Sequence, residues 1–332
     1  MSDWTHQLFA MQLPDGWVLL ENILQSVYTG TIVGCIYGLM CVGLALIFSV
    51  MRVINFAQGE SLMLGMYAAF FCFAHLGLNA LLGVYIGPFV SALLSGVFVF
   101  VLGVAIYELL LRHITGMRVA KSEGEGHYPQ LTLTLGLSLM LSNGALLLFG
   151  STPQTMRTPL SSTAWEIGPL GETGMMLFLN QGRTVAAFVA VAVAMGVSLF
   201  ISRSRVGTMM RAAADNPMAA TFVGIHVGKS HRLAFALGSA ITAIAGGLIA
   251  TYYPFQPYIG VEFIIIMYTG VMLGGMGSVS GAFLGGLTIG LVQQVSTLVL
   301  PNQLQNAAIF VVFLVILLVR PQGLFGRSVE RV

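Results

Sequence analysis

Charged residues are scarce in this 332-residue chain, in which Asp, Glu, Lys and Arg together make up 8%. A soluble domain carries about 25% of these residues, so this chain has too little charge to cover a water-exposed surface. Hydrophobic residues make up 57%, and forty glycines are typical of helices that span a membrane. The composition therefore predicts an integral membrane protein. The net charge of +2 is too small to indicate a nucleic-acid partner.

Catalytic and metal-binding patterns are also missing from the sequence. There is no G-x-x-x-x-G-K-[ST] sequence and hence no P-loop for ATP. The six histidines form no HxxxH or HExxH pair, and GGMGSVSG lacks the third glycine of a dinucleotide-binding fingerprint. Cys35, Cys41 and Cys72 lie in apolar runs, which is typical of small packing residues. We therefore expect no enzymatic activity, no metal and no cofactor.

Long apolar runs predict the membrane spans, since a spanning helix needs roughly 20 mostly apolar residues. Such runs lie near 22–50, 61–79, 84–111, 130–150, 183–202, 232–254, 279–300 and 304–320. A shorter run at 262–276 is typical of a re-entrant or broken helix. We expect an all-α polytopic membrane helix bundle with eight or nine transmembrane segments, in which residues 1–332 form a single membrane domain.

Basic residues predict the orientation, because they accumulate on the cytoplasmic side of a membrane. Residues 1–21 contain Asp and Glu but no Lys or Arg, so we expect an extracytoplasmic N-terminal segment without a cleavable signal. Nine passes then place the C-terminus in the cytoplasm. Twelve of the fourteen basic residues fall in predicted inner segments: Arg52, Arg112, Arg118, Lys121, Arg203, Arg205, Arg211, Lys229, Arg232, Arg320, Arg327 and Arg331. The exceptions, Arg157 and Arg183, flank an outer loop at 151–182 that could form an external cap or docking surface.

Small residues at four-residue spacing predict close helix contacts, because this spacing places them on one helix face. The three sets are Gly30, Gly34 and Gly38; Gly277, Gly281 and Gly285; and Gly238, Thr242 and Gly246. Two interpretations stay open, namely packing within one chain and a dimer or moving seam. The first two sets flank polar turns, a weak indication of a duplicated architecture.

The predicted cytoplasmic loop 203–231 contains a short helix with recognisable ends. In Asp215-Asn216-Pro217, the asparagine can cap a helix and the proline suits its first position. Gly224 suits the left-handed residue after the helix end, which places the helix at 217–223. Ser230 could cap the next span.

Apolar side chains on this short helix leave its role open. Met218, Phe222 and Val223 would lie at the cytoplasmic side of the membrane. The helix could lie on lipid, or it could bind a cytoplasmic partner.

Polar residues between apolar runs are the candidates for a solute pathway. The stretch SVMRVINFAQGES contains Asn55, Gln58 and Glu60, expected near the inner mouth, where they could bond backbone groups at a helix break or contact the solute. Glu60 could cap the next helix, and Arg52 could pair with it or face lipid headgroups. Further polar residues in predicted spans are Ser138, Ser142, Asn143, Glu262 (a possible helix cap), Gln293 and Gln294. The pathway candidates are Asn55, Gln58, Glu60, Asn143, Gly275, Gly277 and Ser278.

Six motifs in order resemble the inner-membrane permease subunits of branched-chain amino acid ABC importers, the LivH type. They are VINFAQGE at 53–60, AADNPMAATFVGI at 213–225, AFALGSAITAIAGGL at 234–248, YIG at 258–260, GVMLGGMGSVSGAFLGGL at 270–287 and RPQGLFGR at 320–327. Some members have His where this chain has Gln58, so the resemblance gives no support for a titrating group there.

The resemblance implies a multi-pass protein of the cell inner membrane that carries hydrophobic amino acids. Its implied partners are membrane lipid, a second homologous permease subunit, two cytoplasmic ATP-binding subunits and a periplasmic solute-binding protein. The ATPase-coupling segment would be Asp215, Asn216, Pro217, Met218, Phe222 and Gly224. Urea, amides or other amino acids are alternative solutes. A carrier or channel driven by an ion gradient is disfavoured, because it usually has acidic or histidine relays within its spans.

Overall fold

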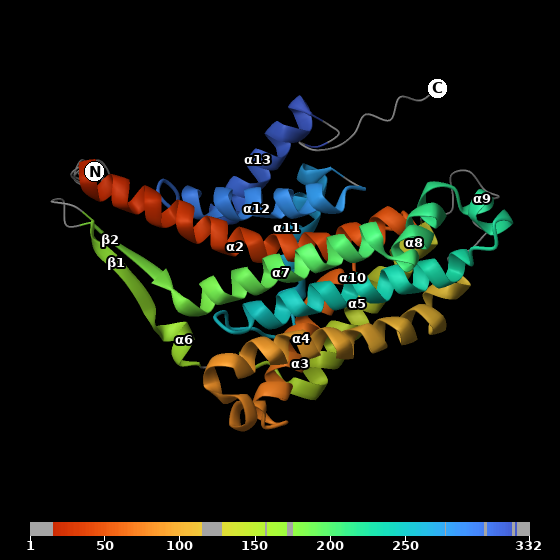
Figure 1. The fold of residues 1–332 in the computed structure, drawn as a ribbon, viewed down its shortest axis with the longest axis horizontal. Coiled ribbons are helices and arrows are strands. Elements are labelled where there is room, and N and C mark those ends of the chain that lie inside the picture. The colour runs from red at the N-terminus through yellow and green to blue at the C-terminus, as the bar shows by residue number, and fades with distance from the viewer. Residues whose placement is uncertain are drawn as a thin grey trace, which may run out of the picture.

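The computed structural model describes residues 16–114, 128–156, 158–170, 175–275, 277–301, 304–320 and 323. Helices dominate this part of the chain, as the sequence predicts (Figure 1). The nine apolar helices are α2 (Gly16–Met51), α3 (Gln58–Ala74), α4 (Leu78–Leu109), α5 (Tyr128–Phe149), α7 (Gln181–Arg203), α10 (Val227–Ile249), α11 (Ile259–Gly274), α12 (Val279–Ser296) and α13 (Gln305–Val319). Short elements join them: η1 (Leu111–His113), α6 (Pro159–Ser162), β1 (Ala164–Leu170), β2 (Met175–Asn180), α8 (Arg205–Asp215) and α9 (Pro217–Phe222).

The helix lengths agree with a polytopic membrane bundle. Within the described residues, six helices are long and apolar enough to cross a membrane: α2, α4, α5, α7, α10 and α12. Helices α11 and α13 are shorter, with 16 and 15 residues, and α3 has 17. The predicted short segment at 262–276 is therefore a helix, α11, that begins three residues earlier. Several predictions fall outside the described residues. They concern residues 1–15, most of the motif at 320–327, and the basic residues Arg118, Lys121, Arg157, Arg327 and Arg331.

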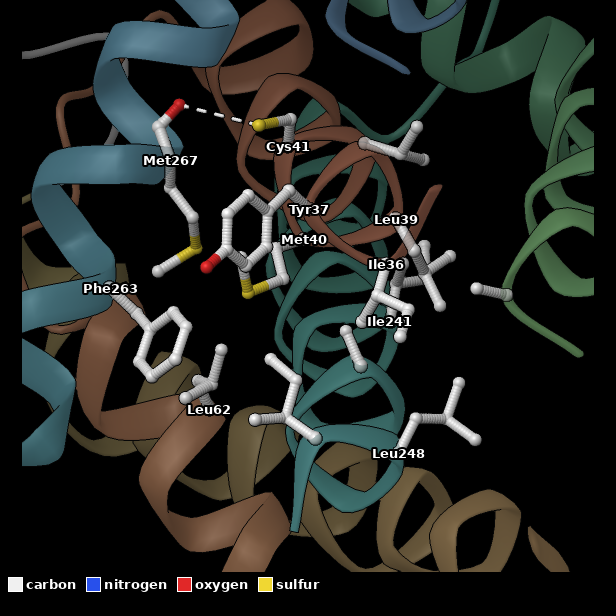
Figure 2. Packing of buried hydrophobic residues seen from close by; sticks show 14 of the residues in the cluster. Ile36, Tyr37, Leu39, Met40, Cys41, Leu62, Ile241, Leu248, Phe263 and Met267 are labelled. Atoms are coloured by element: carbon white, nitrogen blue, oxygen red, sulfur yellow. Dashed lines mark hydrogen bonds between the residues drawn. The ribbon is translucent and has the colours of Figure 1, made fainter. Parts of the chain in front are cut away.

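Helices α2 and α10 form the centre of the bundle. Figure 2 shows Ile36, Leu39 and Met40 of α2 packed near Ile241 and Leu248 of α10, with side chains of α3 and α11 beside them. The thiol of Cys41 is fully buried and donates a 3.6 Å hydrogen bond to the carbonyl oxygen of Met267. Cys41 thus packs inside the protein, as its apolar sequence context predicts.

The predicted small-residue faces are contacts within this one chain. A Cβ on Gly34 of α2 would lie 2.6 Å from the carbonyl oxygen of Leu287 of α12, so only glycine lets these backbones approach so closely. Gly30 and Gly38 also face α12, whereas Gly281 and Gly285 face α11. The prediction for Gly277 is wrong. This residue has a φ of +102° in the turn before α12, and a Cβ there would meet nothing within 4 Å.

The loop 151–182, predicted to lie outside, contains a β-hairpin that the sequence did not predict. Strands β1 and β2 are antiparallel, and Trp165 pairs with Leu179. The side-chain amide of Gln25 extends this pairing, since its Nε2 donates to the Phe178 carbonyl oxygen at 2.8 Å and its Oε1 accepts from the Phe178 N–H at 3.1 Å. The hairpin and the α8–α9 segment lie at opposite ends of the bundle (Figure 1).

Candidate functional site

The break between α2 and α3 is organised by Asn55. Helix α2 ends where Arg52 adopts a left-handed φ of 53°, and the exposed Arg52 side chain points away from the buried polar residues that follow. The Oδ1 of Asn55 accepts a 3.0 Å hydrogen bond from the N–H of Ala57, and its Nδ2 donates to the Oε1 of Gln58 at 3.1 Å. These bonds turn the chain and begin α3.

Gln58 joins this break to the middle of α10. Its Nε2 donates to the carbonyl oxygen of Gly238 at 3.1 Å and to the Oγ1 of Thr242 at 2.5 Å. Gly238 is the twelfth of the 23 residues of α10, so the side-chain amide of Gln58 lies beside the centre of that helix. The expected place of Gln58 near the inner mouth stays a prediction. Gln58 is fully buried, and all of these partners are internal.

Glu60 lies where the amino ends of α3 and α11 meet. One carboxylate oxygen accepts a 3.1 Å hydrogen bond from the Oγ of Ser138 in α5, while Oε2 is buried with no hydrogen-bond partner. A Cβ on Gly260, the second residue of α11, would lie 3.0 Å from this Oε2. Glu60 forms no side-chain cap and no pair with Arg52, contrary to those two expectations. Two helix amino ends provide a favourable electrostatic setting for its carboxylate.

The remaining pathway candidates divide between two places. Asn143 is on α5, about one turn beyond Ser138, and its Oδ1 lies 3.5 Å from the hydroxyl of Tyr258 just before α11. Gly275, Gly277 and Ser278 instead form the turn between α11 and α12, where Ser278 caps α12 by accepting a 3.0 Å bond from the N–H of Gly281. Asn143 thus contacts the residue just before α11, whereas the α11–α12 turn has a separate position.

The short helix predicted within the loop 203–231 is present as α9. The Oδ1 of Asn216 accepts hydrogen bonds from the N–H groups of Met218 at 3.1 Å and Ala219 at 3.0 Å. Pro217 is its first residue, and Gly224 follows its end with a φ of +85°. Asp215 is the last residue of α8. The expected cap at Ser230 is wrong, because Ser230 is buried inside the first turn of α10 and no side chain caps that helix.

Helix α9 exposes its apolar side chains. Phe222 is 87% exposed, Val223 is 79% exposed and Met218 is 65% exposed. By contrast, Met210 and Ala213 of the preceding α8 are buried against the bundle. α8 therefore anchors the segment, and α9 presents an apolar surface at the end of the bundle opposite the hairpin (Figure 1).

The polar side chains near the α2–α3 break form what we call the buried polar group: Asn55, Gln58, Glu60, Thr242 and Ser138. The sequence did not connect Thr242 and Ser138 with the other three. Thr242 was counted only as a small packing residue, yet it accepts from Gln58 and donates to the Gly238 carbonyl oxygen at 3.1 Å. The sequence places Ser138 among the polar residues of a predicted span but indicates no partner for it. In the structure its partner is Glu60. Both contacts join residues far apart in sequence, so local spacing held no signal for them.

A bundle in which six of the described helices are long and apolar enough to cross a membrane defines a multi-pass helical membrane protein. The chain belongs to the family described as the branched-chain amino acid transport system / permease component, whose model matches residues 26–319. It is thus a transport component rather than an enzyme.

The similarity to known proteins covers nearly the whole chain. The chain is 30% identical to the high-affinity branched-chain amino acid transport system permease protein BraD of Pseudomonas aeruginosa, over 94% of this chain and 99% of that protein. It is 29% identical to the permease protein LivH of Escherichia coli K12, over 93% of this chain and 97% of that protein. A probable LivH of Methanocaldococcus jannaschii is 25% identical over 87% of this chain and 88% of that protein. No solved structure matches.

Proposed function

We propose that the chain is a transmembrane permease subunit of an ATP-driven importer for branched-chain and other hydrophobic amino acids. It would form half of the translocation pathway with a second homologous permease, in the inner membrane with its N-terminus outside. Two cytoplasmic ATPases and a periplasmic solute-binding protein complete the proposed assembly. The observation that carries this proposal is the near full-length similarity to permeases named for branched-chain amino acid transport.

The surface of α9 supports the proposed ATPase contact. Aromatic and methionine side chains that lie fully exposed on a structured element are typical of protein interfaces. Because Asn216 caps α9 and α8 is packed on the bundle, a push on Phe222 would be passed to α7 and α10. ATP binding would close the ATPases, and α9 would transmit that movement to the spans.

The buried polar group supports two different roles. Asn55 and Gln58 use their side chains within the protein, which suits residues that hold the helix break. Glu60 keeps one carboxylate oxygen without a partner, so it is our candidate for contact with a passing solute. Glu60→Gln should then raise the KM for uptake while leaving the melting temperature almost unchanged. A lower melting temperature at unchanged KM would assign Glu60 a structural role instead.

Co-purification and vesicle uptake test the proposed assembly. The chain should co-purify with ATPase and second permease subunits, and vesicles that contain this assembly should accumulate leucine only with ATP and the binding protein. The isolated chain should accumulate nothing. Directional uptake by the isolated chain would contradict the proposal, and uptake of urea or an amide in place of leucine would change the solute.

A further inference from the structure

A polar cavity of about 260 Å³ lies between α2, α7, α11, α12 and the first turn of α13. It also reaches the segment after α10 and is separate from the polar group around Gln58. Arg183, in the first turn of α7 directly after the hairpin, is one of its lining residues. The cavity therefore opens toward the hairpin end of the bundle, opposite α9.

Two opposite charges line this cavity without pairing. The guanidinium of Arg183 lies 5.1 Å from the centre of the Tyr252 ring, a cation–π contact that fixes its position. Glu262 lies in the first turn of α11 and is exposed. The described residues form two side-chain ion pairs, in which Arg112 and Arg232 both contact Glu108. Neither pair includes Arg183 or Glu262, so within the described residues each of these two keeps a free charge.

The side-chain amide of Gln293, which hydrogen-bonds the hydroxyl group of Tyr37, adds a free acceptor to these charges. Gln293 of α12 lines the cavity, and its Oε1 is buried with no hydrogen-bond partner. Buried polar atoms normally have partners, so an orphaned acceptor at a cavity wall indicates a missing donor. A ligand ammonium group supplies such a donor.

Part of the wall is apolar, beside tyrosine and amide side chains. Val33, Ile249, Phe263 and Ile266 line the same cavity. A small aliphatic side chain would be removed from water against them, at about 25 cal/mol per Å² of apolar surface. One cavity thus combines a cation, an anion, a free acceptor and an apolar wall.

We propose that this cavity binds one free zwitterionic amino acid with a small aliphatic side chain. Arg183 binds the α-carboxylate, and Glu262 and Gln293 bind the α-ammonium group. The site rests on the proposed function, since it would hold the solute on the extracytoplasmic side before translocation. The cavity is open and its charged groups are partly hydrated, so binding is weak enough for release.

Ligand-observed NMR tests this site on the full-length chain in lipid nanodiscs, with any subunits that co-purify and without the binding protein. The probes are L-leucine, isopentylamine, which lacks the carboxylate, and 4-methylpentanoate, which lacks the ammonium group. The wild type should bind leucine about tenfold more tightly than either single-charge analogue. Arg183→Gln should remove about tenfold in affinity for leucine and spare isopentylamine. Glu262→Gln should weaken leucine and isopentylamine and spare the acid.

Matched controls use the same substitutions elsewhere. Arg203→Gln changes the other end of α7, and Glu166→Gln changes an exposed residue of β1, so both should bind leucine as the wild type does. Because Glu262 is exposed, Glu262→Gln stays informative even if Arg183→Gln, which loses its contact with Tyr252, fails to fold.

Parallel uptake measurements separate this site from the proposed function. An unchanged affinity for leucine in Arg183→Gln overturns the site. Leucine uptake by the complete importer also overturns it if NMR detects no leucine binding at this cavity. Binding of another zwitterion that depends on Arg183, without leucine uptake, supports the site and rejects the proposed solute.

Discussion

The break between α2 and α3 and the α9 segment use the same local chemistry in opposite surroundings. In each, an asparagine Oδ1 accepts from the backbone just before or within the start of the next helix: Asn55 from the N–H of Ala57, and Asn216 from the N–H groups of Met218 and Ala219. Asn55 is 1% exposed and its neighbour Gln58 is fully buried. Near Asn216, Phe222 is 87% exposed.

The two places differ in which side chains have partners within the chain. At the buried break the polar groups find partners on α10, so the break fixes the helices relative to one another. At α9 the backbone is satisfied, but apolar side chains have no cover within the described chain. Substitutions at the break should therefore act on stability, whereas substitutions at α9 should act on coupling.

Adding volume at the buried break should give the largest effect. A Cβ on Gly43 of α2 would lie 2.6 Å from the carbonyl oxygen of Gly238, one of the acceptors of Gln58. Because backbone atoms cannot move aside as a side chain can, Gly43→Leu should cost about 3 kcal/mol or more. The measurement is the yield and melting temperature of detergent-purified protein. Gly196→Leu on α7, where a Cβ would meet nothing within 4 Å, is the control and should fold.

A charge on the exposed surface of α9 should have the next largest effect, on transport alone. Phe222→Asp should weaken the proposed ATPase contact by about 2 kcal/mol, or roughly thirtyfold. The melting temperature should stay within error, since the side chain contacts little of its own chain. ATP-dependent uptake and ATPase stimulation measure the effect. His226→Asp adds the same charge at the cap of α10, where a carboxylate is favourable, and should retain uptake. Normal uptake in Phe222→Asp would reject the coupling role.

Removing the amide at the buried break should give a smaller loss of stability. Gln58→Leu leaves the Nδ2 of Asn55 without its acceptor, although Thr242 still donates to Gly238. An orphaned buried polar group costs about 1–3 kcal/mol, and we expect the lower half of that range. Thermal unfolding measures it. Gln25→Leu, which removes an amide pairing at the hairpin on a more exposed part of α2, should cost less. Equal losses would show that burial does not separate the two amides.

The sequence predicted elements whose signals are local. Asn216, Pro217 and Gly224 define both ends of α9 within nine residues, and the apolar runs located each of the nine apolar helices in the described part of the chain. Four-residue glycine spacing also predicted a close contact at Gly34 correctly. These features depend on backbone preferences and helix periodicity, which a single sequence carries.

Features set by distant partners escaped the sequence. Gln58 meets Thr242 across 184 positions, and Glu60 meets Ser138 across 78, so no spacing rule connects them. Ser230 resembled a cap, but the helix began earlier, at Val227, and buried it. Arg183 was an exception to the charge distribution of the loops, and its place at a cavity wall beside Tyr252 gives a physical reason for that exception.

Exchanging the two asparagines for glycine gives the smallest expected effect and the sharpest comparison. Asn216→Gly should cost only a few tenths of a kcal/mol, because glycine is itself tolerated at a helix N-cap and water can reach the freed N–H groups of Met218 and Ala219. Asn55→Gly removes a similar bond but also orphans the Oε1 of Gln58 in a buried place, so it should cost several times more. Thermal unfolding of the two variants measures this ratio. Equal costs would mean that solvent access does not distinguish the two places, and that the bonds from each asparagine to the backbone determine the loss of stability.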